Sequence, residues 1–584
     1  MNAPAGQLAF TDPPLVARVV PDLTGLDKQF DYLVPESMRA QVAVGSLVRV
    51  PLHGRRVGGW VVALGPPDPA LPVERLVEIT KWSSVGPPPE VVDLARWAGP
   101  RWGTDRLRPY LVAASPPSMV VRPRQVRRTV VPAEGAVGVA AGDVWSGVRR
   151  IAPLTDPLPI VVEAVRRGPA LVLHPSPAAA AALGRRLRKE GFTVAVAPED
   201  WAAAAAGVDV VVGSRAAVWA PCPGLAAVVV LDEHDEAYQE ERSPTWQARD
   251  VAVERARRAG ASCVLVSPCP TANALRWAGA NVADLPAGER VPAWPFLEID
   301  DRSDLEPWKR SLVGSALIAH LRDPAKRVVC VLNTTGRARL LACRSCRTLQ
   351  RCERCEAAVA QRDDGMFHCP RCDAVRPQVC QVCGGTAMAL SKPGVTRLRE
   401  ELEAAANRPV AAVTGATEDL PAGDVFIGTE AVLHRVRGVD VVAFLDIDAE
   451  LLAPRYRAAE QAMALLVRAG RLVGPRFGGG RVLVQTHVPD HPVLQAYRFA
   501  DPERLDAIEL ARRRLLGLPP FRALAAVEGA EAGEFAAATG LESAPTARGV
   551  LLRADTWEEL GRRLATTPRP KGSRLRVEVD PPRA

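Results

Sequence analysis

The pattern of hydrophobic and polar positions divides the chain into segments of different character. Residues 15–65 alternate apolar and polar positions in short runs separated by turn residues, which predicts a small β-rich domain. Residues 148–285 instead alternate apolar runs, such as 225–231, with Ala- and Arg-rich helical stretches. Strands that alternate with helices in this way predict a parallel, doubly wound sheet.

A second series of the same kind begins at 327–333 and resumes after a cysteine-rich block, with a predicted helix over 457–472. The block therefore interrupts a second α/β region. The end of the chain has the mixed pattern of a compact α+β domain. The fold class that we expect is α/β, with a β-rich domain at the start and an α+β domain at the end.

Length, composition and charge are those of a large globular protein. The 584 residues are enough for several domains, and 48% hydrophobic residues are ample for several cores. No window is long and apolar enough to span a bilayer, and the N-terminus lacks the pattern of an export signal. We therefore expect a cytoplasmic protein with no membrane contact. The net charge of +8 is too modest to predict nucleic-acid binding by itself.

Eight of the twelve cysteines form four C-x2-C pairs between positions 343 and 383. Eight thiolates are enough for two closed tetrahedral sites, and a site of four cysteines is structural rather than catalytic. We expect two zinc ions per chain; redox dithiols and iron-sulfur ligation are the alternatives. The predicted ligands are Cys343, Cys346, Cys352, Cys355, Cys369, Cys372, Cys380 and Cys383.

An acidic segment, LDEHDEAYQEE at 231–241, directly follows a predicted strand. Carboxylates at the C-terminal end of a parallel strand lie where such sheets bind ligands, and an Asp-Glu pair there can hold the magnesium ion of a nucleotide. A loop of solvated acids is the alternative. None of the seven lysines follows a glycine, so the chain has no Gly-Lys-Ser/Thr phosphate loop.

Several long segments resemble the PriA family of bacterial replication-restart helicases. The segment VVVLDEHDEAYQEERSPTWQARDVAVERA at 228–256 resembles the family's acidic helicase motif, aromatic loop and following helix. FDYLVPESMRAQVAVGSLVRVPL at 30–52 resembles its N-terminal DNA-end-binding domain, and RVLVQTHVPDHPVLQ at 481–495 and RRRLLGLPPFRA at 512–523 resemble its closing segments. The cysteine spacing also resembles the family's paired zinc ribbons. This resemblance implies two RecA-like helicase lobes with a zinc-ribbon insertion.

The sequence departs from the family pattern at every ATPase motif. RRIAPLTDPLPIVVEAV at 149–165 replaces the Gly-rich loop with its lysine, and the acidic box is one residue short, as Asp232, Glu233 and His234. The late Gln- and Arg-containing box keeps Arg468 and Arg471 without the Gln. We therefore interpret these five residues as a relic nucleotide site with no catalytic residue. An ATPase in which Arg149 or Arg150 replaces the lysine is the alternative.

The resemblance also implies DNA contacts and a cysteine grouping. It assigns capture of a DNA 3′ end to Phe30, Asp31 and Tyr32, although Phe30 and Tyr32 could instead pack as alternate residues of one strand. A ring can stack on the terminal base while a carboxylate accepts a hydrogen bond from a free 3′-hydroxyl. Tyr238 and Trp246 fall in the loop that senses single-stranded DNA in the family, with a core role for Trp246 as the alternative. The family pattern groups the two outer cysteine pairs at one zinc and the two inner pairs at the other.

These observations predict seven segments along the chain. They are an N-terminal 3′-end-binding domain (1–118), a linker in place of a winged helix (119–147), lobe 1 (148–290), the start of lobe 2 (291–342), the double zinc-binding insertion (343–390), the rest of lobe 2 (391–490) and a C-terminal domain (491–584).

The function that we expect is that of a degenerate PriA-like primosomal protein, not an enzyme and associated with the nucleoid. It would recognise forked, 3′-ended or single-stranded DNA and help to load the replicative helicase. The implied partners are other primosome proteins, single-strand-binding protein and the replicative helicase or its loader. The alternatives are an active ATP-dependent 3′ to 5′ helicase and a zinc-ribbon protein scaffold in DNA repair.

Overall fold

The computed structural model describes most of the chain. The described residues are 14–26, 28–69, 73–123, 128–129, 146–304, 311–332, 340–362, 364–390, 398–413, 417, 419–546, 548–570 and 574–583. The predicted linker at 119–147 falls mostly outside them.

The N-terminal domain is an antiparallel sheet of five strands in the order β2-β1-β4-β3-β5, followed by two helices. The polar-apolar alternation predicted here puts one face of the sheet on a small core around Val19, Tyr32 and Val50. The elements are β1 (Val16–Pro21), β2 (Phe30–Leu33), η1 (Glu36–Met38), β3 (Leu47–Leu52), β4 (Arg55–Gly65), η2 (Val73–Arg75), β5 (Lys81–Ser84), α1 (Pro89–Arg101) and α2 (Arg108–Ala114).

Lobe 1 is a parallel sheet of seven strands in the order β12-β6-β11-β10-β7-β9-β8. Its central strands are continuous apolar runs, because helices cover both faces. The elements are β6 (Gly147–Arg150), α3 (Leu158–Arg166), β7 (Ala170–Leu173), α4 (Pro177–Lys189), β8 (Val194–Ala197), α5 (Trp201–Ala206), β9 (Val210–Gly213), η3 (Arg215–Trp219), β10 (Ala227–Leu231), η4 (Glu236–Tyr238), α6 (Ala248–Ala259), β11 (Ser262–Ser267), α7 (Ala272–Ala278), β12 (Val282–Ala283) and α8 (Ala287–Arg290).

Lobe 2 is a second parallel sheet, in the order β13-β23-β22-β14-β21-β20. The long helix α13 is buried along much of its length, which agrees with the helix predicted over 457–472. The elements are β13 (Phe296–Asp301), α9 (Ser315–Leu321), β14 (Val328–Val331), α10 (Leu398–Ala406), β20 (Ala411–Val413), β21 (Val425–Gly428), α11 (Ala431–Arg435), β22 (Val441–Phe444), α12 (Asp448–Leu451), α13 (Ala458–Val473), β23 (Arg481–Thr486), α14 (Pro492–Arg498) and α15 (Glu503–Leu516).

The cysteine module is inserted in lobe 2 after β14 and consists of two very small sheets. Its strands are β15 (Leu341–Cys343), β16 (Ala360–Gln361), β17 (Met366–His368), β18 (Val375–Pro377) and β19 (Met388–Leu390). The C-terminal domain is an antiparallel sheet in the order β25-β26-β24-β27 with two helices. Its elements are β24 (Ala523–Glu528), α16 (Ala532–Thr539), β25 (Glu542–Thr546), β26 (Gly549–Ala554), α17 (Trp557–Thr566) and β27 (Arg576–Val579).

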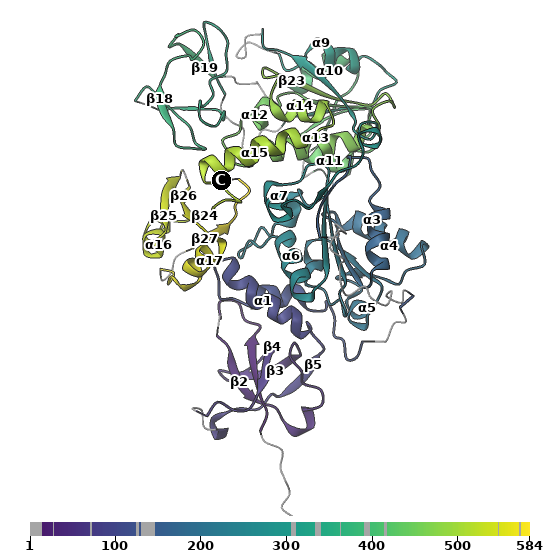
Figure 1. Cartoon of the computed structure of the whole chain (residues 1–584), viewed down its shortest axis with the longest axis vertical. Helices are drawn as coiled ribbons and strands as arrows, with labels where there is room; N and C mark the ends of the chain where they lie inside the picture. Colours follow the sequence, from purple (N-terminus) through teal and green to yellow (C-terminus); the bar gives the residue numbers. More distant parts are fainter. Residues whose placement is uncertain are drawn as a thin grey trace, which may run out of the picture.

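The domains follow one another along the molecule (Figure 1). The N-terminal sheet lies at one end of the long axis, and lobe 2 with the cysteine module lies at the other. The C-terminal domain returns to the middle, where α17 packs on α1. Gly561 of α17 lies directly against the backbone of Pro100 in α1, where a side chain would have no room.

This architecture confirms the predicted α/β fold class, with two parallel-sheet lobes, a β-rich N-terminal domain and an α+β C-terminal domain. Among the described residues, no helix is long and apolar enough to cross a membrane.

Candidate DNA-end pocket, interlobe site and metal centres

The N-terminal sheet carries an open pocket of about 600 Å³ beside its edge strand β2. Phe30, Asp31 and Tyr32 all line it, so the structure brings the three predicted DNA-end residues together. Tyr32 is also part of the core, and its hydroxyl donates to the carbonyl oxygen of Pro51 at 3.1 Å. The other lining residues are Arg18, Gln29, Pro51, Arg75, Leu76 and Val77.

Arg18 is a pocket residue that the sequence reasoning missed. It lies on β1 directly opposite Asp31 of β2, and its Nε and Nη2 donate to the two carboxylate oxygens at 2.9 and 3.1 Å. These hydrogen bonds and the charge of Asp31 raise the pKa of Arg18. Asp31 is therefore one half of an ion pair and not an isolated carboxylate.

The acidic box lies between the two lobes. Asp232 directly follows β10 with φ of 52°, and Arg471 of α13 donates from Nη1 and Nη2 to its two oxygens, at 2.6 Å each. Burial raises the pKa of Asp232, but the charge and hydrogen bonds of Arg471 outweigh it and hold that pKa well below its ordinary value. Nε of Arg471 donates to the carbonyl oxygen of Pro153, in the loop after β6, at 2.9 Å. One arginine of lobe 2 thus contacts two loops of lobe 1.

A second pair crosses the same interface. Arg468 donates to Asp235 at 2.8 Å and also contacts Glu430 of its own lobe. His234 lies behind these pairs, where its Nδ1 is 2.8 Å from Oγ of Ser267 at the end of β11. Burial lowers the pKa of His234, which favours the neutral imidazole. The two arginines that the family pattern predicts therefore do face lobe 1.

Glu233 has a structural role in this arrangement. Its fully buried carboxylate accepts from the backbone N–H of Thr271 at 2.7 Å and pairs with Arg249 at 3.2 Å. Thr271 in turn caps α7. Glu233 therefore joins β10 to α6 and α7, and of the adjacent Asp232 and Glu233 it is Asp232 that faces the other lobe.

The segment that replaces the phosphate loop lies between β6, the second strand from one edge of the sheet, and the start of α3. Both arginines that could replace the lysine are engaged elsewhere. Arg150 is buried and pairs with Asp284 at 2.8 Å and Asp506 at 2.6 Å. Arg149 lies 3.4 Å from Glu163. Both guanidinium groups are thus paired with acidic side chains.

The two aromatic residues predicted to contact single-stranded DNA are core residues in this structure. Tyr238 is 0% exposed, and its hydroxyl donates to the carbonyl oxygen of Leu231 at 2.7 Å. Trp246 is 3% exposed and packs edge-on against Trp219, with ring centroids 5.5 Å apart. Neither ring has a free face on which a base could stack. The sequence pattern misled because an aromatic residue near an acidic loop can equally close the core behind it.

The eight cysteines of the module form two groups of four. Within each group, the Sγ atoms all lie within 4.8 Å of one another. Cys343, Cys346, Cys380 and Cys383 form one group, and Cys352, Cys355, Cys369 and Cys372 form the other. These are the same two sets that the family pattern implies. Four thiolates at such distances fit the tetrahedral coordination of zinc.

Each C-x2-C pair has the same backbone conformation. The residue after the second cysteine has positive φ in all four pairs, and its N–H donates to the carbonyl oxygen of the first cysteine at 2.8–2.9 Å. Only one of these residues is glycine; the four are Arg347, Glu356, Asp373 and Gly384. Three non-glycine residues in this strained region indicate that something else holds the turns, and a bound metal ion would do so.

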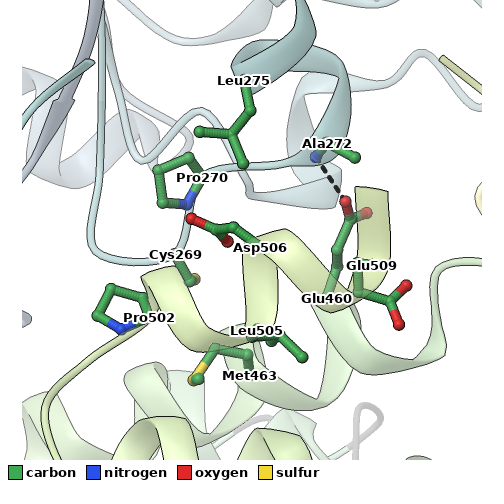
Figure 2. Close-up of a pocket in the computed structure, with 10 residues that line it drawn as sticks. All are labelled: Cys269, Pro270, Ala272, Leu275, Glu460, Met463, Pro502, Leu505, Asp506 and Glu509. Carbon is green, nitrogen blue, oxygen red and sulfur yellow. Dashed lines mark hydrogen bonds between the residues drawn. The ribbon is translucent and has the colours of Figure 1, made fainter. Parts of the chain in front are cut away.

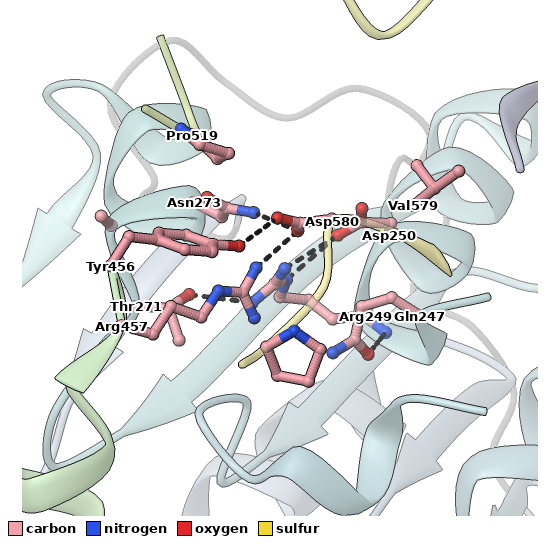
Figure 3. Close-up of polar contacts among 12 residues, drawn as sticks. Gln247, Arg249, Asp250, Thr271, Asn273, Tyr456, Arg457, Pro519, Val579 and Asp580 are labelled. Atoms are coloured by element: carbon pink, nitrogen blue, oxygen red, sulfur yellow. Dashed lines mark hydrogen bonds and ion pairs between the residues drawn. The ribbon is translucent and has the colours of Figure 1, made fainter. Parts of the chain in front are cut away.

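A buried polar cluster joins both lobes to the end of the chain (Figure 3). Asp580 accepts from the Tyr456 hydroxyl at 2.8 Å and from Nδ2 of Asn273 at 2.9 Å, and it pairs with Arg457 at 2.6 Å. Tyr456 and Arg457 precede α13 of lobe 2, whereas Asn273 belongs to α7 of lobe 1. Asp580 directly follows the last strand, so the C-terminal domain ties the two lobes together.

A small cavity of about 10 Å³, enough for one water molecule, lies between α7, α13 and α15 near this junction (Figure 2). Glu460 and Asp506 line it beside Cys269, and Glu460 accepts from the N–H of Ala272 at 2.7 Å. The buried acids here belong to interdomain contacts.

The N-terminal domain is similar to a known family of DNA-binding domains. The family model of the PriA 3′ DNA-binding domain matches residues 18–105. These residues include all nine residues that line the pocket. The chain thus combines a region similar to a 3′ DNA-binding domain with two parallel-sheet lobes and a cysteine module.

The curated relatives are replication restart proteins. The replication restart protein PriA of Bacillus subtilis is 28% identical over 349 residues, which cover 55% of this chain and 43% of that protein. The match to the PriA of Synechocystis covers 42% of the relative, so these matches span less than half of the relatives' length. The probable PriA of Mycobacterium tuberculosis is 29% identical over 587 residues, covering 86% of this chain and 85% of that protein. The chain is therefore similar to PriA replication restart proteins, in one case over most of its length.

Solved DEAD-box proteins resemble the chain only distantly. Saccharomyces cerevisiae Dbp5 bound to RNA and ADP BeF3 has 12% identity and a TM-score of 0.34, over 74% of this chain and 98% of that one. A DEAD box protein from Methanococcus jannaschii has 9% identity and a TM-score of 0.29, over 64% and 86% of the two chains.

The comparisons contradict the prediction that the chain is not an enzyme. Its curated relatives are replication restart proteins PriA, the family of helicases that the sequence resembles. The prediction rested on the loss of the phosphate loop and of the other ATPase motifs, whereas these relatives point to an enzyme.

Proposed function

We propose that this chain recognises forked or 3′-ended DNA at its N-terminal pocket and helps to assemble the primosome there. The observation that supports the proposal is the gathering of Phe30, Asp31 and Tyr32 around one open pocket within the matched 3′ DNA-binding domain. Phe30 is half-buried, so part of its ring can stack on a terminal base. Asp31 keeps lone pairs that Arg18 does not use, and these can accept a hydrogen bond from a 3′-hydroxyl.

Partner proteins are the second half of the proposal. We infer that the chain helps to load the replicative helicase with other primosome proteins and single-strand-binding protein. The cysteine module, inserted at the end of the molecule remote from the pocket, offers a surface for such contacts. Two structural zinc ions would hold its two small sheets, which have little core of their own.

Short single strands test the end recognition directly. Oligonucleotides of one sequence, blocked at either the 5′ or the 3′ terminus, are titrated against the full chain by fluorescence anisotropy. We expect tighter binding of the strand with the free 3′ terminus. Phe30→Ala should remove this preference, whereas Phe521→Ala, a change in the C-terminal domain, should keep it. Equal binding of both strands by the unaltered chain contradicts the proposal.

The second candidate function is ATP-dependent DNA unwinding, which the family favours. The supporting contacts are the two ion pairs that cross the lobes, Asp232 with Arg471 and Asp235 with Arg468. Arginines that face an acidic box across an interface are placed to stabilise the charge of a transferring phosphate. Because Arg471 already occupies both oxygens of Asp232, that pair would have to open before Mg²⁺ could bind there.

Phosphate release with forked DNA tests this candidate. DNA-stimulated hydrolysis that Arg471→Ala abolishes and that Arg257→Ala, at an exposed arginine of α6, preserves would support it. Hydrolysis that Arg471→Ala leaves unchanged, or none at any ATP concentration, would contradict it and leave the DNA-end proposal standing.

A further inference from the structure

Lobe 2 exposes two phenylalanines on one part of its surface. Phe477 is 81% exposed in the loop between α13 and β23, and Phe499 is 52% exposed at the end of α14. Rings this large are seldom left so open to water, and such exposure marks interaction sites more often than chance. Neither residue belongs to the DNA-end pocket or to the interlobe pairs.

Arg476 connects these two segments to the start of β13. Its Nη2 donates to the carbonyl oxygen of Arg498 at 3.1 Å, and its Nε donates to that of Trp294 at 3.3 Å. Its guanidinium also lies 5.9 Å from the ring centroid of Phe296, the first residue of β13. The loop that carries Phe477 is therefore held against the end of α14.

Two further arginines lie over rings of the same group. The guanidinium of Arg481 is 5.0 Å from the centroid of Phe296, and that of Arg504 is 5.0 Å from the centroid of Phe499. Cationic groups and rings thus alternate across this part of lobe 2. Such interleaving is typical of surfaces that stack bases and contact phosphates together.

The charge balance of the surface is positive. Glu298 lies 3.9 Å from Arg481, and Asp501 pairs with an arginine of α15 at 3.0 Å. Among the described residues, no acidic side chain pairs with Arg476 or Arg498. Two of the four arginines around the rings therefore keep their full charge for a ligand.

Glycines present Phe477 on a tight turn. Gly474 and Gly479 have φ of 81° and 87°, a conformation that residues with side chains rarely adopt. The ring is thus held out from the lobe by a short turn whose neighbouring arginine is anchored.

We infer that this surface, formed by Phe296, Arg476, Phe477, Arg481, Arg498, Phe499 and Arg504, binds single-stranded nucleic acid without sequence preference. It would act independently of the 3′-end pocket. Every base has a face that can stack on an exposed ring, and the unpaired arginines can neutralise backbone phosphates. An acidic peptide would satisfy the arginines but leave two rings without partners, so we favour nucleic acid.

A circular single-stranded oligonucleotide tests this inference, because it has no terminus for the DNA-end pocket. We expect Phe477→Ala with Phe499→Ala to raise the Kd for a circle of thymidines about tenfold or more, since each stacked base contributes about that factor. Leu515→Ala is the matched control, because Leu515 of α15 is 71% exposed and outside the surface. Arg498→Gln should reduce the dependence of log Kd on log salt by about 0.7, the value for one phosphate contact on a single strand.

Three outcomes would overturn the inference. The first is a double variant that keeps the Kd of the unaltered chain for the circle, and the second is a Leu515→Ala variant that loses as much affinity for the circle as the double variant does. The third is a double variant that loses binding to poly-glutamate but still binds the circle. The last would assign the surface to an acidic protein partner. None of them bears on the preference for a free 3′ terminus, so the two proposals fail separately.

Discussion

Replacing Arg18 with alanine should sharpen the choice that the pocket makes between DNA ends. In the unaltered chain the Arg18 guanidinium is bonded to both oxygens of Asp31 and offsets its charge. It also keeps donors that can reach a terminal phosphate, because half of its side chain is exposed. Its removal leaves a bare carboxylate beside the DNA end.

The magnitude follows from the geometry of the pair. A 3′-phosphate that takes the place of the guanidinium would lie about 4 Å from Asp31, where two unit charges interact by about 4 kcal/mol at an effective dielectric constant of about 20. The pocket is open to solvent, and exposed pairs are usually worth about 1 kcal/mol or less. We therefore expect a loss of about 1 kcal/mol for a 3′-phosphate end and almost none for a 3′-hydroxyl end. The ratio of the two Kd values should rise about fivefold.

The assay compares two forks that differ only in the leading-strand terminus at the junction, hydroxyl or phosphate. Fluorescence anisotropy at low salt gives both Kd values for each variant. Arg108→Ala is the matched control, because Arg108 forms a similar exposed pair with Asp22 at 2.8 Å in the same domain but does not line the pocket. A ratio that stays at the Arg108→Ala value, or that falls, would refute the reasoning.

Three further predictions concern stability and metal binding. Asp580→Ala and Arg457→Ala should each lower the free energy of unfolding by about 3–5 kcal/mol, because each leaves a buried charge without its partner. In urea unfolding, the double variant should lose clearly less than the sum of the two single losses. Additive losses would argue against a coupled pair. Native mass spectrometry should find two zinc ions per chain and one in Cys369→Ser, and two in that variant would exclude Cys369 as a ligand. Burial raises the pKa of Asp506 to about 7 despite the neighbouring Arg150, so the folded state holds this proton more tightly than the unfolded state does. The melting temperature should therefore fall as pH rises from about 4 to 7, and Asp506→Asn should flatten that slope.

Much of the fold is predictable from local patterns in the sequence. Buried central strands such as β10 are continuous apolar runs, whereas β3 of the N-terminal sheet alternates, with Val48 and Val50 buried on either side of the exposed Arg49. The cysteine pairs were equally informative, because a C-x2-C turn is a local structure and its spacing identifies the cysteines that can bind a metal ion. The spacing does not show which two cysteine pairs share a metal ion. That grouping was predicted from the resemblance to the family.

Contacts between distant segments account for what sequence reasoning missed. Arg18 and Asp31 are in contact only because β1 and β2 pair in one particular register. The sequence of either strand alone does not determine that register. Asp580 meets Arg457 across 123 positions, counted as 580 minus 457, with no motif at either residue. Such residues look like ordinary surface charges until the tertiary structure buries them.

The most direct test of DNA-end recognition is the affinity of the full chain for two forks of identical sequence. One carries a leading strand whose free 3′ end abuts the junction, and the other lacks that strand. The account predicts that the first fork binds several-fold more tightly, and that Asp31→Ala removes most of the difference while both forks still bind. Equal affinity of the unaltered chain for the two forks would contradict it.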